Sequence, residues 1–230
     1  MKEKEAMEMI VETLKDVSIH KQNVYENVGL TFKTLKSVLK DFASNLCAQI
    51  DECDSRVTVD FNDVGDFEAH LRIAGDVLVF HMHTNVFQFD KSHSVWHTSY
   101  VKENDNRAYC GVINVYNFLN DSFKYHRNND SGYLVSRIFV NSENHFLVQG
   151  KRQMGVLYND FVNDFLDKDR LLEIVESIVL YTLKFDLYVP PYDSVQEVTV
   201  HEMKQLSDSL QIKTAKRLGF KFQSDQEDFL

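Results

Sequence analysis

Glycine and cysteine are scarce in this chain, and it contains no long apolar segment. It has 8 glycines in 230 residues. No glycine-rich loop follows a strand-like segment, so the usual nucleotide-binding folds are not expected. No apolar run approaches the ~20 residues of a membrane-spanning helix, and the charged amino terminus lacks the apolar centre of a signal peptide. We therefore expect no membrane partner.

The cysteines and the charge balance argue against further classes of protein. Cys47, Cys53 and Cys110 are an odd number without CxxC spacing, which argues against a zinc ribbon or a redox motif. Few cysteines without a pairing pattern predict a reduced, cytoplasmic protein. The 25 Lys and Arg residues are outnumbered by 35 Asp and Glu residues, giving a net charge of −10. An acidic surface repels phosphate backbones, so we do not expect a nucleic-acid partner except through a local basic patch.

What is present is the composition of a packed globule, with 43% hydrophobic and 12% aromatic residues. We expect a single domain over residues 1–230. Its patterns divide it into a helical part at 1–50, a sheet at 56–152 and a second helical part at 158–222. The predicted fold class is therefore α+β, an antiparallel sheet of six or seven strands flanked by two N-terminal and about three C-terminal helices.

The first helical part contains two amphipathic patterns. Residues 2–17 predict one helix, and residues 31–50 predict a second with a narrow apolar seam. The seam repeats every three or four positions and consists of Phe32, Leu35, Leu39, Phe42 and Leu46. It can pack on the sheet or the first helix, or it can form a homodimer through helix 31–50. The short length of the repeat favours packing within the chain.

Seven segments rich in Val, Phe and Tyr predict the strands. They are 56–61, 67–74, 76–89, 94–101, 107–119, 132–140 and 145–151. No helical pattern separates them, which favours an antiparallel meander. The polar segment 120–132 predicts a long loop, and a turn at Ser142 and Glu143 would pair Ile138 with Leu147.

The second helical part ends in a recognisable cap. Helical spacing predicts helices at 160–168 and 169–185, which the pair Pro190 and Pro191 would stop. Thr199 and Glu202 have the spacing of a capping box and predict a last helix. Its end is expected at Leu218 and Gly219.

The stretch from 67 to 97 contains five of the nine histidines. Its pattern also predicts which residues of its first two strands lie opposite each other. Its apolar and polar residues alternate, as in a half-buried strand. Gly75 and Asp76 suit a two-residue turn, which pairs Ala74 with Val77. The later pairs on the apolar face are Ile73 with Leu78, Leu71 with Phe80 and Ala69 with Met82. Those on the polar face are Arg72 with Val79, His70 with His81 and Glu68 with His83.

This register predicts a patch that could bind a metal ion. Two histidines on one strand, His81 and His83, with His70 directly across, can converge on Zn²⁺ or another divalent transition metal. Glu68 would be a fourth ligand or would support one of the imidazoles. The alternative is the ordinary polar face of a one-sided antiparallel sheet.

The sequence contains no complete catalytic motif, and we therefore favour a binding function without catalysis. The expected site is the polar face of the sheet, with Glu68, His70, Arg72, His81 and His83 as ligand-binding residues for a protein partner or a small ligand. A metal-binding protein or metal-dependent enzyme centred on the three histidines is the alternative. A second alternative is nucleic-acid binding through a basic C-terminal helix that carries Lys213, Lys216, Arg217 and Lys221.

Overall fold

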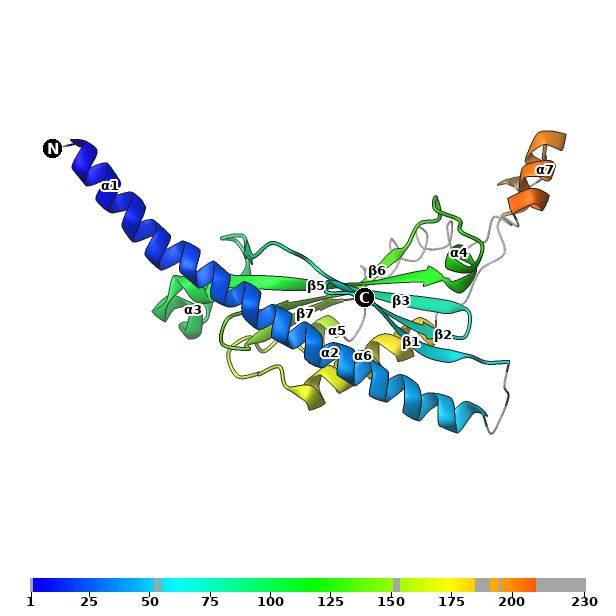
Figure 1. The fold of residues 1–230 in the computed structure, drawn as a ribbon, viewed down its shortest axis with the longest axis horizontal. Coiled ribbons are helices and arrows are strands. Elements are labelled where there is room, and N and C mark those ends of the chain that lie inside the picture. The colour runs from blue at the N-terminus through cyan, green and yellow to red at the C-terminus, as the bar shows by residue number, and fades with distance from the viewer. Residues whose placement is uncertain are drawn as a thin grey trace.

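The computed structural model describes residues 2–51, 54, 56–150, 154–184, 191–194 and 196–209. It confirms the α+β class, with a seven-stranded antiparallel sheet, a long N-terminal helix and several shorter helices (Figure 1). The strands run in the order β1-β2-β3-β5-β6-β7, and β4 pairs with β5. Their bounds are β1 (Val59–Gly65), β2 (Glu68–Ile73), β3 (Asp76–Met82), β4 (Phe87–Gln88), β5 (Tyr109–Leu119), β6 (Tyr133–Val140) and β7 (Phe146–Gly150).

The strand predicted at 94–101 is wrong, because this segment is helical. It contains the 3₁₀ turn η2 (Ser94–His97), the helix α3 (Ser99–Glu103) and then the 3₁₀ turn η3 (Asp105–Ala108). The Thr98 hydroxyl accepts a hydrogen bond from the N–H of Val101 and so caps α3. Val95 and Val101 are still buried, but from helical turns.

One continuous helix replaces the two predicted at the amino terminus. It consists of α1 (Lys2–Thr13), the π-helical turn η1 (Leu14–Ser18) and α2 (Ile19–Asp51). Val24 and Val28, in the stretch expected to separate two helices, are fully buried, so packing keeps this stretch helical. The α1 part extends beyond the sheet (Figure 1), and its apolar residues Met7 and Ile10 are more than half exposed.

Helices α2 and α6 (Lys168–Leu183) cover one face of the sheet, here called the inner face. Phe32, Leu35 and Leu39 of the predicted seam are at most 1% exposed. They share a hydrophobic cluster with inward-facing strand residues such as Phe80 and Ile138. The seam is therefore used within the chain.

The described helices after the sheet differ in part from those predicted. The described ones are α5 (Met154–Leu157), α6, the 3₁₀ turn η4 (Tyr192–Ser194) and α7 (Val200–Ser209). The helix predicted at 160–168 is wrong. Asp167 is the N-cap of α6, because its side chain accepts a hydrogen bond from the N–H of Arg170 at 2.8 Å, and the helix therefore begins only at Lys168. The capping box is confirmed by reciprocal hydrogen bonds between Thr199 and Glu202. The predicted end at Leu218 and Gly219 lies outside the described residues.

The predicted loop at 120–132 begins with a helical turn, α4 (Asn120–Lys124). The turn between β6 and β7 is also wider than predicted, because the side chain of Asn141 accepts hydrogen bonds from the N–H groups of Glu143 and His145. Ile138 therefore pairs with Val148 instead of Leu147, a correction of one residue.

The β2–β3 hairpin is present, but its predicted register is wrong by two residues. Ala74 and Gly75 form the turn, with Ala74 at a φ of +52°, and the pairs are Ile73 with Asp76 and Leu71 with Leu78. A shift of two keeps every side chain on its expected face, because the pleat has a period of two. The hydrophobic pattern therefore predicted the two faces correctly but could not distinguish these two registers.

Candidate functional site

The outer face of the sheet, opposite α2 and α6, is covered at one end by residues 89–108 and 161. Its buried strand residues include Val112, Phe139 and Leu147, which form a second hydrophobic cluster with Val101 and Phe161. The cover includes residues 94–101, which were predicted as a strand. It therefore decides which part of the outer face is buried.

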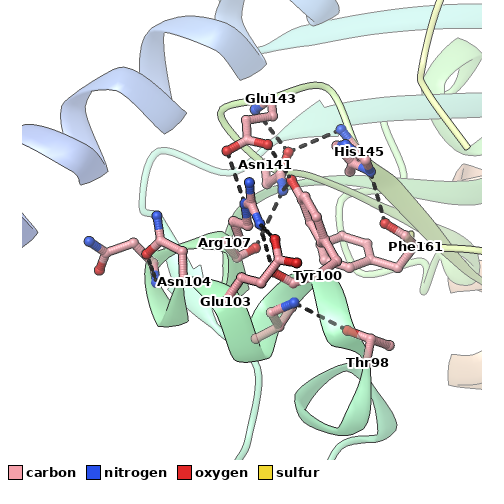
Figure 2. Close-up of polar contacts among 11 residues, drawn as sticks. Thr98, Tyr100, Glu103, Asn104, Arg107, Asn141, Glu143, His145 and Phe161 are labelled. Atoms are coloured by element: carbon pink, nitrogen blue, oxygen red, sulfur yellow. Dashed lines mark hydrogen bonds and ion pairs between the residues drawn. The ribbon is translucent and has the colours of Figure 1, made fainter. Parts of the chain in front are cut away.

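A polar network attaches this cover to the β6–β7 turn (Figure 2). The Tyr100 hydroxyl donates to Glu143 Oε2 and accepts from Asn141 Nδ2, both at 2.9 Å. Arg107 donates from Nε to Glu143 Oε1 at 3.2 Å and from Nη1 to the Tyr100 carbonyl at 2.9 Å. The His145 ring stacks on Tyr100 with 4.1 Å between the ring centroids. The network thus joins two segments that are far apart in the sequence.

The electrostatics of this network are those of a structural brace. Burial raises the pKa of Tyr100, so its hydroxyl stays protonated and donates. Burial acts against ionisation of Glu143 too, but the hydrogen bonds from Tyr100 and Arg107 outweigh it and lower the pKa of Glu143. These groups are therefore partners of one another and connect the cover to the β6–β7 turn. Sequence reasoning missed the network, and its only local signal was the pair of capping residues Thr98 and Asn104.

The open part of the outer face carries a row of polar side chains across five strands. Each member pairs directly with the next on the neighbouring strand. The row, called the polar row below, consists of Glu68, His81, Asn114, Arg137 and Gln149. Arg137 and Gln149 are exposed and the other three are partly buried. Long-range strand pairing therefore brings these five residues into one line.

The ends of the polar row are held by hydrogen bonds, whereas its centre is not. His70 Nε2 and Glu68 Oε1 lie 2.7 Å apart, so the imidazole donates to the carboxylate. At the other end, Arg137 donates from Nη2 to Gln149 Oε1. Within the part of the chain that the structure describes, the side chains of His81 and Asn114 make no hydrogen bond. The centre therefore presents unused donors and acceptors.

A mixed apolar margin borders the polar row on the side away from the cover. Val79 on β3 pairs with Tyr116, and Tyr116 pairs with Leu134, which is 38% exposed. Phe123 of α4 contacts His70 edge to face, with ring centroids 5.2 Å apart. The open face thus offers polar groups beside an aromatic and aliphatic border.

The corrected register separates the predicted site residues. Glu68 lies opposite His81, whereas His70 lies opposite Val79. His83 follows the end of β3, where its ring contacts Phe87 with centroids 4.7 Å apart. Arg72 forms an ion pair with Asp60 across β1 and β2, with 2.8 Å between Nε and Oδ1.

The cross-strand arrangement on which the metal prediction depended is therefore absent. In the described ranges, no group of three His, Cys, Asp or Glu side chains converges as a metal site requires. The basic residues Lys213, Lys216, Arg217 and Lys221 lie outside the described residues. Among the helices that the structure describes, none combines the length and hydropathy needed to cross a membrane.

Comparisons with protein-family models, with curated proteins and with solved structures found no match. The interpretation of the site therefore depends on its geometry and chemistry.

Proposed function

We propose that this protein is a cytoplasmic binding protein, without catalytic activity, that takes up a protein or small ligand on the polar row. The observation that carries the proposal is the pair His81 and Asn114, which lie opposite each other on β3 and β5 and whose side chains make no hydrogen bond to any described residue. Neither side chain has a fully buried polar atom that lacks a partner, so the donors and acceptors of both remain accessible from outside. A bound ligand would supply the missing partners.

The position of Asn114 strengthens this interpretation. Asparagine is disfavoured in strands, yet Asn114 lies near the middle of the 11-residue strand β5, between β3 and β6. The charged residues on either side of the central pair His81 and Asn114, namely Glu68 and Arg137, are already oriented by hydrogen bonds. Groups held in place before binding lose less conformational entropy when a ligand arrives.

Site-specific photo-crosslinking tests the proposal. A photoreactive phenylalanine analogue replaces Gln149, the exposed end of the polar row, and a matched control carries it at Glu176, an exposed position on α6. In extracts of the source cells we expect adducts from position 149 that are absent from position 176. The same adducts should disappear when His81→Ala and Asn114→Val are added.

Adducts that form equally from both positions, or that survive both substitutions, would overturn the proposal. Thermal melting of each variant ensures that a lost adduct does not reflect unfolding.

A further inference from the structure

The polar row has opposite charges near its two ends. The Glu68 carboxylate lies on β2, and the Arg137 guanidinium lies on β6. Glu68 accepts from His70, and Arg137 donates to the neutral amide of Gln149. Arg137 forms no ion pair with an acidic residue in the described part of the chain. The row therefore presents a negative and a positive charge, neither of them paired with an opposite permanent charge.

The distance between these charges is set by the sheet. Three steps between neighbouring strands separate Glu68 from Arg137. At about 4.8 Å per step, the two backbones are about 14 Å apart. An extended peptide advances about 3.4 Å per residue, so about four residues span this distance.

The two central side chains match a peptide backbone. The Asn114 carboxamide can donate and accept, and a neutral His81 imidazole has one donor and one acceptor. A peptide that crosses the face of a sheet cannot pair with an edge strand, so its N–H and C=O groups need partners from side chains. His81 and Asn114 offer such partners between the two charges.

We propose that the occupant of the polar row is an extended segment of a partner protein that carries an acidic residue over Arg137 and a basic residue four positions away over Glu68. This inference rests on the proposed function and adds the chemistry of the ligand. Charge complementarity at the two ends sets the direction in which the segment lies.

Selection from a random dodecapeptide phage library on the full chain tests the inference. We expect enriched peptides with one acidic and one basic residue four positions apart, in one preferred order. The double variant Glu68→Arg with Arg137→Glu keeps the net charge and should enrich the opposite order. Peptides selected on the unmodified protein should bind this variant at least about tenfold more weakly, as measured by fluorescence anisotropy.

A matched control reverses the exposed ion pair of Lys168 on α6 and Asp41 on α2, whose Nζ and Oδ2 atoms are 3.1 Å apart. This control should select the same peptides as the unmodified protein. Enrichment without the four-residue spacing, no enrichment at all, or the same order from both charge arrangements would overturn the inference.

The Asn114→Val variant separates the inference from the proposed function. If it loses the selected peptides while the charge reversal has no effect, the polar row binds ligand but the charge rule is wrong. If it binds the selected peptides unchanged, the polar row is not the site and both proposals fail.

Discussion

The two faces of the sheet are built from the same strands but differ in what covers them. The inner face is mainly apolar and is buried under α2 and α6. The outer face is apolar where residues 89–108 cover it and along the margin that contains Val79 and Leu134, and it is polar along the open row. Burial of the inner face therefore specifies the fold, whereas the open outer face carries the polar row on which the proposed function depends.

The largest expected effect comes from the inner face. Phe80→Ala removes a fully buried ring from the main hydrophobic cluster and should lower the free energy of unfolding by about 3–5 kcal/mol. Urea denaturation measures the loss. The control Phe87→Ala truncates a ring that is 42% exposed and should lower it by about 1 kcal/mol or less. An equal loss of unfolding free energy in both variants would contradict the difference in burial between Phe80 and Phe87.

The brace of the outer cover should contribute less. Tyr100→Phe removes the hydroxyl that joins Asn141 to Glu143 and should lower the free energy of unfolding by about 1–3 kcal/mol. Limited proteolysis should also cleave residues 89–108 faster than in the unmodified protein. Tyr192→Phe, at a site that is 77% exposed, should change neither measurement. A Tyr100→Phe protein with the same free energy of unfolding as the unmodified protein would contradict the assignment of the network as a brace.

The same brace should weaken in acid. The pKa of Glu143 is lower in the folded chain than the usual unfolded value of about 4.3, so the unfolded state binds the proton more tightly. Its stabilising contribution is complete well above about pH 4.3 and is lost as the pH falls through the lowered folded value.

Glu143→Gln should therefore be less stable than the unmodified protein by about 1 kcal/mol or less at pH 7, since the carboxylate is 43% exposed. Chemical unfolding at several pH values should show this gap closing below about pH 4.3. Glu26→Gln, on the exposed side of α2, should show no such gap. A gap that widens in acid would contradict the direction of the pKa shift.

The smallest expected effect has the opposite sign and lies in the polar row. Asn114→Val should stabilise the fold by about 0.5 kcal/mol, because valine suits a strand and the unpaired amide is removed. Thermal melting measures the gain, and Asn62→Val on the exposed edge strand β1 is the control. Clear destabilisation by Asn114→Val would show that the amide has a structural role.

Local patterns predicted those features that depend on neighbours in the sequence. Alternation along β2 and β3 assigned Leu71, Leu78 and Phe80 to the buried face, and all three are fully buried. The capping box at Thr199 and Glu202 was predicted for the same reason, because both partners lie within one helical turn.

Two of the errors have a common physical origin in competing interactions. The side chains of Thr98 and Asn141 bind nearby backbone N–H groups and so replace a strand with helical turns in one place and widen a turn in the other. In the β2–β3 hairpin, two registers place the same residues on the same face, so hydrophobicity alone could not choose between them.

The sequence by itself determined the α+β class, the two faces of the sheet and the presence of Glu68, His70 and His81 on the polar face. Only the tertiary structure decided that Asn114, Arg137 and Gln149 join Glu68 and His81 in one row, and that residues 89–108 cover one end of the outer face. The reason is that side-chain periodicity is a local property, whereas strand order and register are decided by contacts between distant segments.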